Sequence, residues 1–420
     1  MDFTPSPRSA DLTARVRDFI DSRIEPVEPE ILADVRARRD CGGNPWTIHP
    51  LVGELQTQAR SQGLWNLFLP AGHEGPYAAR FGTDGAVGLT NVDYAPIAEQ
   101  TGRSGLAPLI FNCNAPDTGN MEVLLKYGSQ EQKDTWLEPL LDGRIRSAFL
   151  MTEPDVASSD ATTMAATARL DGDEVVLDGR KWWSTGVGHP DCAVGIFMGV
   201  TDPHAPKHAR HSMVLVPLDA PGVTIERVMP ALGQWDEPLG HGQVSLTGVR
   251  LPASAIIGGP GRAFAIAQGR LGPGRVHHCM RLIGLAERAL ELACARASAR
   301  VAFGKPLANL GGNRERLAEA RIAINQARLH VLHCAWMLDT VGVAGAASEV
   351  SEIKAAVPRM ACQVIDLAIQ LHGGAGVSAD TPLAAAYAGA RALRLADGPD
   401  EVHLGVVARH LLRPYQPEHR

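Results

Sequence analysis

The sequence lacks the features of a secreted, membrane-spanning or nucleic-acid-binding protein. Its seven cysteines are odd in number and never form a CxxC pair, which fits a reducing compartment better than a disulfide framework. Residues 1–23 have no apolar core, and the charge-free apolar stretch from Cys192 to Val200 is far shorter than the roughly 20 residues of a membrane-spanning helix. Lysine and arginine total 40 against 46 acidic residues, so positive charge is not concentrated as duplex binding requires. We expect a soluble cytoplasmic protein without signal peptide, membrane anchor or nucleic-acid partner.

Familiar nucleotide and hydrolase motifs are also missing. There is no GxGxxG after a strand and no GxxxxGK(S/T), so a Rossmann or P-loop nucleotide site has no support. GxSxG is absent, and the serines of VASSD (156–160) have no recognisable base beside them, which argues against a serine hydrolase. The histidine pairs at 277/278 and 330/333 lack cysteine or carboxylate partners at ligand spacing, so we predict no metal.

The first third of the 420-residue chain has helical periodicity, and the whole chain is long enough for two to three domains. An apolar stripe recurs at helical spacing until Pro26 and Pro29 interrupt it. Further helices are expected at 50–63, 88–103 and 130–141, which predicts a helical domain over residues 1–145. The stripe consists of Leu12, Val16, Phe19, Ile20 and Ile24.

The pattern changes between residues 146 and 258 to short runs of Val, Leu, Ile and Thr. Asp-Gly pairs at 171–172 and 178–179 read as turns between these runs. Apolar residues alternate over 243–252, which predicts a half-buried antiparallel sheet or small barrel. The alternating residues stand on the two sides of an expected turn and are Val244, Leu246, Val249 and Leu251.

Helical periodicity returns after the glycine-rich joint at 258–262 and persists to the end. It is clearest over 312–339, and Pro358 within the run 351–371 predicts a kink or a helix start. We therefore expect a helical-bundle domain over residues 259–420. The stripe in 312–339 consists of Leu317, Ala320, Ile324, Ala327, Val331 and Cys334.

Several short segments carry a specific pattern when they are taken in order. They are FLMTEPDVASSDA (149–161), DGRKWWSTG (178–186), RVAFGKP (300–306), IQLHGGAGV (369–377) and LADGPDEVH (395–403). With GLWNLFLP (63–70) and LLKYGSQEQKDTWLEPLLDG (124–143) upstream, they resemble the FAD-dependent acyl-CoA dehydrogenases over essentially the whole chain. TEPDVASSDA and DGPDEVH are most similar to the type that in animals is fused behind a kinase-like domain. The resemblance implies a mainly α fold with β: an N-terminal helical domain, a middle antiparallel β-barrel and a C-terminal four-helix bundle.

The resemblance also implies a reaction, in which a carboxylate removes the α proton of an acyl-CoA thioester while a hydride leaves the β carbon for flavin N5. The base of most members stands in a Glu-Gly-Thr loop, and the matching residue here is Asp397, which is one methylene shorter. Read alone, Asp397 also fits a turn-forming residue before Gly398. The alternative base position of some members is Gly274 here, which has no side chain. Gly398 is implied to lie against the acyl-CoA, and Arg275 to orient the base or substrate unless it caps a surface helix.

FAD is the cofactor that the resemblance implies. It places Phe149, Met151, Thr152, Ser158 and Ser159 along the isoalloxazine, and leaves open which serine contacts flavin or the CoA phosphate. The resemblance places Trp183 near N5. Without the motif, Trp183 would be interpreted as an aromatic residue in the core of a strand. The other implied FAD contacts are Thr185 near N5, Arg300 and Phe303 at the pyrophosphate and adenine, Gln370, Gly373 and Gly374 offered by a neighbouring subunit, and Pro399, Asp400 and Glu401 beside the base.

The implied partners are an acyl-CoA substrate, an electron-transfer flavoprotein and further copies of the chain in a dimer or tetramer. Two alternatives stay open at this stage. One is a nitroalkane oxidase or acyl-CoA oxidase-like flavoenzyme on the same scaffold. The other is a catalytically silent, nucleic-acid-associated relative, against which the net charge of -6 and the retained Asp397 argue.

Overall fold

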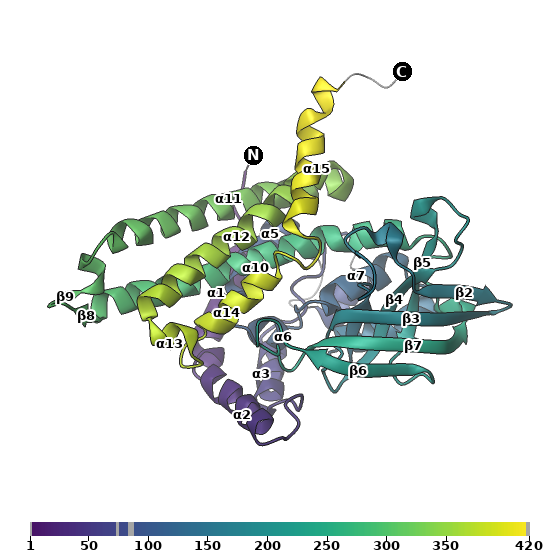
Figure 1. Ribbon diagram of the computed structural model, residues 1–420, viewed down its shortest axis with the longest axis horizontal. Coiled ribbons are helices and arrows are strands. Elements are labelled where there is room, and N and C mark those ends of the chain that lie inside the picture. The colour runs from purple at the N-terminus through teal and green to yellow at the C-terminus, as the bar shows by residue number, and fades with distance from the viewer. Residues whose placement is uncertain (1, 73–74, 83–87, 417–420) are drawn as a thin grey trace. The chain divides into compact units, whose positions relative to one another are not determined.

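The structure is a computed structural model that describes residues 2–72, 75–82 and 88–416 (Figure 1). It divides into two compact units. The helical unit comprises Met1–Ser22, Leu89–Ala107 and Arg275–Arg420, and the sheet unit comprises Arg23–Gly88 and Pro108–Gly274. The division falls inside one long helix, α10 (Ala263–Ala299). Its start agrees with the helical periodicity that returns after the glycine-rich joint at 258–262.

The helical unit is built from long helices with apolar stripes. α1 (Pro7–Phe19) begins at Ser6, whose hydroxyl accepts a hydrogen bond from the Ser9 backbone N–H at 3.1 Å, and the stripe that the sequence predicted is buried. The chain continues from α1 as a π-helical turn, Ile20–Ile24. The other helices are α5 (Asn91–Thr101), α11 (Asn313–Gly345), α12 (Ala347–His372), α13 (Gly374–Val377), α14 (Leu383–Ala392) and α15 (Asp400–Leu412).

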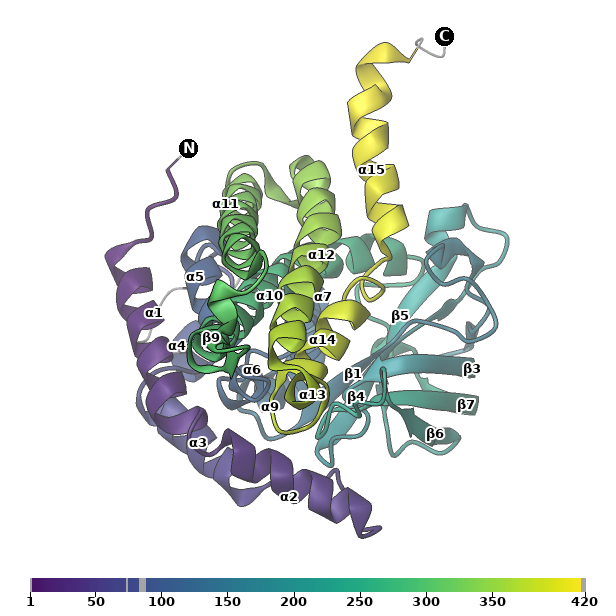
Figure 2. The same cartoon turned by 60° about the vertical axis from the view of Figure 1, so that its left-hand side comes forward.

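α11 and α12 lie side by side in the helical unit (Figure 2). The predicted stripe of α11 is confirmed, because Ala320, Ile324 and Val331 are buried. α12 begins at Ala347 and continues through Pro358, so the helix start that the sequence allowed at this proline is not there. Two short strands, β8 (Val301–Ala302) and β9 (Lys305–Pro306), form a hairpin between α10 and α11.

The sheet unit holds seven strands (Figure 1), and its core consists of buried, mostly aliphatic side chains. The path β1-β4-β2-β3-β7-β6 has β5 as a second partner of β4, and β1 and β2 run parallel to β4 while the other pairs are antiparallel. The middle β domain is therefore confirmed, but its sheet is mixed and not wholly antiparallel as the sequence predicted, because β1 and β2 pair in parallel with β4. The strands are β1 (Arg146–Leu150), β2 (Thr167–Asp171), β3 (Glu174–Thr185), β4 (Cys192–Val200), β5 (His211–Pro217), β6 (Val223–Met229) and β7 (His241–Pro252).

Two expected turns are bulges instead. Asp178-Gly179 lies inside β3, and residues 247–248 lie inside β7, opposite each other where the pairing register shifts. A bulge inserts an extra residue, so the side-chain alternation of β7 shifts by one and Leu246 and Val249 both face the core. Glycine-containing segments that predict a turn in the sequence therefore form a bulge within a continuous pair of strands.

Short helices complete the sheet unit. They are α2 (Glu28–Asp40), α3 (Pro50–Ser61), α4 (Tyr77–Phe81), α7 (Asp117–Tyr127), α8 (Gln130–Gln132) and α9 (Glu138–Leu141), with a π-helical turn at Lys133–Leu137 and α6 (Ala107–Ile110) beginning at the division between the units. They agree with the helices expected at 50–63 and 130–141. Within the described ranges no helix is both long and apolar enough to cross a bilayer. The predicted domain boundaries at residues 145 and 258 stay predictions.

Candidate active site

Asp397 lies in the loop between α14 and α15, in a left-handed backbone conformation that residues other than glycine seldom adopt. Its φ is 55°, and Gly398 follows at 105°. A Cβ on Gly398 would lie 2.8 Å from Nε2 of His403, so this position has no room for a side chain. The loop is thus held in a specific, strained form, which is common where a functional side chain must be aimed.

Three side chains from two helices hold Asp397. Arg275 of α10 donates from Nε to the Asp397 carbonyl oxygen at 2.9 Å, and His403 of α15 reaches the same oxygen from Nε2 at 3.2 Å. Since a carbonyl only accepts, His403 carries its proton on Nε2. His278, one helical turn after Arg275, places Nε2 3.4 Å from Oδ2 of Asp397. Arg275 therefore contacts Asp397 from within a helix and caps no helix end.

Below this loop, α12 presents a buried lysine and an arginine. Lys354 is fully buried and donates from Nζ to the carbonyl oxygens of Leu393 at 2.6 Å and Gly398 at 3.2 Å, which ties both sides of the loop to α12. Burial lowers the pKa of Lys354. Asp400 is buried and accepts from Arg359 at 3.0 Å and from Arg394 at 2.9 Å. The Asp400 carboxylate therefore anchors the start of α15. The FAD contacts expected for Asp400, Pro399 and the exposed Glu401 stay predictions.

Replacing Lys354 with methionine tests this attachment. Lys354→Met leaves two loop carbonyls without their charged donor, and we expect the free energy of unfolding to fall by about 1–3 kcal/mol. Displacement of Asp397 should also slow substrate-dependent flavin reduction by about 10²-fold. Chemical denaturation and stopped-flow absorbance measure the two effects, with the exposed Lys207→Met as matched control. Wild-type values for both quantities would show that Lys354 does not hold the loop.

Two buried histidines predict how stability depends on pH. Burial lowers the pKa of His403 to about 4 and that of His189 to about 3, with Arg275 and Arg146 acting in the same direction. Unfolded chains bind a proton at each imidazole below about pH 6.5 whereas the folded chain does not, so stability is lost as pH falls from about 6.5 toward about 4. Denaturant titrations at several pH values should show a weaker pH dependence in His403→Asn and in His189→Asn. An unchanged slope in both variants would contradict the assignment.

The predicted flavin-facing residues of the sheet unit lie at the ends of β1 and β3. Phe149 is half-buried, and the guanidinium of Arg270 stacks over its ring at 3.9 Å. Thr152 and Ser159 are exposed. Ser158 accepts a hydrogen bond from the Glu153 backbone N–H at 2.9 Å, so its hydroxyl shapes the turn. Of the two serines, Ser159 therefore offers the freer hydroxyl to a ligand.

Trp183 interrupts the regular course of β3. Its φ is 52° and its side chain is 42% exposed, so it is no strand-core aromatic. Thr185, two residues later, ends the strand. An exposed indole beside hydroxyl groups matches the chemistry of a flavin ring, which stacks on aromatic faces and accepts and donates hydrogen bonds along its edge.

A buried ion pair fixes the segment that follows β1. Lys181 of β3 is fully buried and donates from Nζ to Glu153 at 2.7 Å and to the carbonyls of Met151 at 3.0 Å and Met198 at 2.7 Å. Glu153 also accepts from the backbone of Ala165 and Ala166. Burial lowers the pKa of Lys181 to about 8, and Glu153 opposes this shift. The pair sets the path of residues 151–153, which include Met151 and Thr152.

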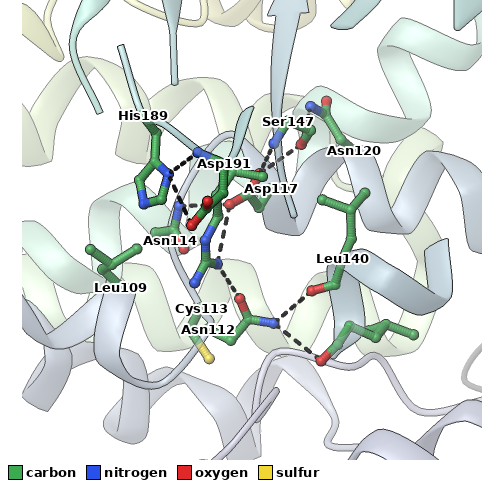
Figure 3. A network of polar contacts seen from close by, with 12 residues as sticks. Leu109, Asn112, Cys113, Asn114, Asp117, Asn120, Leu140, Ser147, His189 and Asp191 are labelled. Atoms are coloured by element: carbon green, nitrogen blue, oxygen red, sulfur yellow. Dashed lines mark hydrogen bonds and ion pairs between the residues drawn. The ribbon is translucent and has the colours of Figure 1, made fainter. Parts of the chain in front are cut away.

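The start of β1 is held by a second buried network (Figure 3). Asp117 accepts from the backbone N–H of Ser147 at 2.8 Å and from its hydroxyl at 2.6 Å, and Arg146 donates to Asn112. Figure 3 also shows His189 directed toward Asp191 beside this network. Both ends of β1 are therefore fixed by polar groups that the sequence reading did not single out.

The predicted adenosine contacts lie on the helical unit, at the hairpin between α10 and α11 and at the end of α12. Phe303 is 95% exposed at the hairpin tip, and Arg300 is exposed beside it. Gln370, Gly373 and Gly374 are exposed where α12 ends, and Gly373 has a φ of 63°. Exposure of these five residues suits a ligand or a second subunit, and their roles stay predictions.

Sequence reasoning identified Arg275 but missed the other residues that hold the Asp397 loop. His278 stands three positions after Arg275 and so shares its helix face, a spacing that could have indicated it. Lys354 is the one cation on the apolar stripe of α12 that includes Val350, Ile353 and Val357, which was a second available signal. His403 belongs to the quoted motif but was given no role.

Comparisons with known proteins agree with this arrangement. Family models match in chain order: the acyl-CoA dehydrogenase N-terminal domain over residues 6–144, the middle domain over 148–249 and the C-terminal domain over 261–412. The chain belongs to the acyl-CoA dehydrogenase family. The resemblance found in the sequence motifs and the fold that it implied are thereby confirmed.

Individual relatives extend this result. FadE2 of Mycobacterium tuberculosis, assigned as an acyl-CoA dehydrogenase, is 49% identical over 97% of this chain and 96% of its own length. Acyl-CoA dehydrogenase family member 10 of Mus musculus is 49% identical over 97% of this chain. A solved structure from Mycobacterium abscessus, assigned to the same enzymes, is 65% identical with a TM-score of 0.93, covering 98% of this chain and all of that one. The chain spans about half or less of the length of the animal relatives that it matches.

Proposed function

We propose that the protein catalyses the FAD-dependent α,β-dehydrogenation of an acyl-CoA thioester, with Asp397 as the base that removes the α proton. Family membership supports the general reaction. The observation that carries the assignment of the base is the fixed Asp397 loop, in which Arg275, His403 and Lys354 hold the backbone on both sides of a half-buried carboxylate.

An α proton of a thioester is a weak acid, so the base must be positioned and the developing negative charge must be stabilised. Asp397 is one methylene shorter than glutamate, and the left-handed backbone with its two donors to the carbonyl oxygen sets where the short side chain begins. His278 faces the carboxylate at 3.4 Å, and because its Nδ1 accepts from Arg281, its Nε2–H is directed toward Oδ2 of Asp397. Gly398 leaves its backbone free of a side chain for the approach of substrate.

The chain offers residues of suitable chemistry for FAD. The indole of Trp183 and the hydroxyls of Thr152, Ser159 and Thr185 suit the isoalloxazine, while Arg300 suits the pyrophosphate because its planar cation matches phosphate oxygens. When bound, FAD supplies the acceptor for the hydride that leaves the β carbon. The chain's own part is to orient the ring, exclude water and hold the α proton at Asp397.

The partners follow from the same proposal. Electrons leave the reduced protein to an electron-transfer flavoprotein, and Gln370, Gly373 and Gly374 reach the adenosine of a neighbouring subunit in a dimer or tetramer. These exposed residues and the exposed Phe303 support a shared cofactor site. The cytoplasm is the proposed compartment, in keeping with seven free cysteines.

Anaerobic titration of the FAD-loaded protein tests the proposal. A panel of acyl-CoA thioesters from short to long should contain members that bleach the flavin absorbance, and free CoA should not. A nitroalkane oxidase would instead be reduced by nitroalkanes without CoA, and an oxidase would be reoxidised rapidly by air. A protein that binds FAD and is bleached by no thioester would refute the proposed function.

A further inference from the structure

Thr185, His241 and Asp236 form a row of three polar side chains in the sheet unit, joined by one hydrogen bond and one longer charged contact. Thr185 Oγ1 is 2.9 Å from Nδ1 of His241, and the two residues pair across β3 and β7. On the far side of the ring, Nε2 of His241 is 3.6 Å from Oδ2 of Asp236. The imidazole thus bridges a hydroxyl and a carboxylate through its two nitrogens.

The backbone holds Asp236 and His241 in these positions. Asp236 has a φ of 56°, and its carbonyl accepts hydrogen bonds from the N–H groups of Leu239 at 2.9 Å and Gly240 at 2.8 Å. The Gly186 N–H then donates to the Gly240 carbonyl at 3.0 Å, which fastens this loop to the end of β3. The carboxylate is therefore presented to His241 by a closed turn.

Close packing surrounds the backbone on both sides of His241. A Cβ on Gly242 would lie 2.0 Å from Val187, and one on Gly240 would lie 2.7 Å from Val228. The indole of Trp183 covers another side of the imidazole, with ring centroids 5.7 Å apart. Glycine is therefore required on both sides of His241, which fixes the backbone position of this residue.

The charge of His241 decides the direction of its bond to Thr185. A neutral ring keeps its proton on Nε2, toward Asp236, so Nδ1 accepts from the Thr185 hydroxyl, whose lone pairs are left to accept from a ligand. A protonated ring donates from Nδ1 to Thr185, and the hydroxyl hydrogen is then free to donate to a ligand. Protonation of His241 therefore changes the Thr185 hydroxyl from a hydrogen-bond acceptor to a hydrogen-bond donor toward the ligand.

We propose that His241, oriented by Asp236, sets whether the Thr185 hydroxyl donates or accepts a hydrogen bond at the flavin, and so tunes the bound cofactor. This inference rests on the proposed function, in which Thr185 and Trp183 face the isoalloxazine. His241 acts through Thr185 and is a positioning residue. Neither His241 nor Asp236 belongs to the motifs that carry the family resemblance.

The charged surroundings of His241 are simple. Asp236, in the loop before β7, is a charged neighbour of the ring. Its uncharged neighbours are Thr185 and Trp183 of β3 and Met229, its cross-strand partner on β6. Glu237, next to Asp236, is engaged by Arg39 at 2.8 Å. Asp236 is therefore the carboxylate that faces the ring.

The absorbance spectrum of bound FAD, titrated from about pH 5 to about pH 9, tests the inference without turnover. The wild type should show a pH-dependent shift of the flavin bands that is lost in His241→Gln. Asp236→Asn should alter this shift, because the imidazole loses the carboxylate that orients it. His204→Gln, at an exposed turn, serves as matched control and should titrate like the wild type.

The outcomes separate this inference from the proposed function. A wild-type flavin that acyl-CoA reduces, but whose bands do not respond to pH, would overturn the role of His241 alone. Retention of the wild-type shift in His241→Gln would do the same. If His241→Gln does not fold, Asp236→Asn carries the test because this side chain is half-exposed, and a wild-type pH response in it would count against the inference. Failure of the wild type to bind FAD would instead refute the proposed function.

Discussion

Asp397→Asn is expected to slow flavin reduction by an acyl-CoA about 10²- to 10⁴-fold, which is the usual contribution of a general base. The amide keeps the size of the side chain and does not accept the proton at neutral pH. Its backbone contacts to Arg275 and His403 do not involve the carboxylate and should persist. FAD affinity and the free energy of unfolding are therefore expected to stay close to those of the wild type. Anaerobic stopped-flow absorbance with a substrate from the titration panel measures the rate.

The matched control is Asp18→Asn, which makes the same chemical change at an exposed position of α1. It should reduce the flavin at the wild-type rate. A rate for Asp397→Asn within a few-fold of the wild type would remove Asp397 as the base. A loss of FAD in this variant would show instead that the loop contributes mainly to cofactor binding.

Lys181→Met is expected to cause the largest loss of stability, about 3–5 kcal/mol, because it leaves Glu153 buried without its cationic partner. The carbonyls of Met151 and Met198 lose their donor at the same time. Since Met151 and Thr152 are proposed flavin contacts, FAD affinity should fall as well. Urea unfolding and fluorescence titration with FAD measure the two effects.

A double variant separates the ion pair from the rest of the site. Glu153→Gln in the Lys181→Met background removes the unpaired charge, so part of the lost stability should return. Lys207→Met, an exposed lysine of the same unit, should be neutral. A double variant as unstable as the sum of the single variants would show that Lys181 and Glu153 do not act as a pair.

Much of the helical architecture was predictable because apolar side chains recur with helical spacing. The stripes through Leu12 and Ile324 are buried as expected. α10 continues without a break through residues 269–274, although glycines there could have ended a helix. Gly269 has a different role there: a Cβ at this position would lie 2.6 Å from the Tyr127 hydroxyl, so the glycine permits close packing within a continuous helix.

The candidate site was predictable where one segment carries the signal. Asp397 and Gly398 were found from a continuous motif, and Arg275 from its match to the family. Lys354 and His241 were not found, because the partners of Lys354 lie about 40 residues away in sequence and those of His241 on another strand or in the preceding loop. Such contacts depend on strand register and helix packing, which periodicity alone does not fix.

Exchange of the substrate α proton with deuterated water measures the central claim most directly. The FAD-loaded protein is incubated anaerobically in deuterated water with an acyl-CoA that bleaches the flavin, and the recovered thioester is analysed by mass spectrometry. We predict deuterium at the α carbon with the wild type and with Asp18→Asn, and its loss with Asp397→Asn. Undiminished exchange in Asp397→Asn would contradict the assignment of Asp397 as the base, because another group would then be removing the proton.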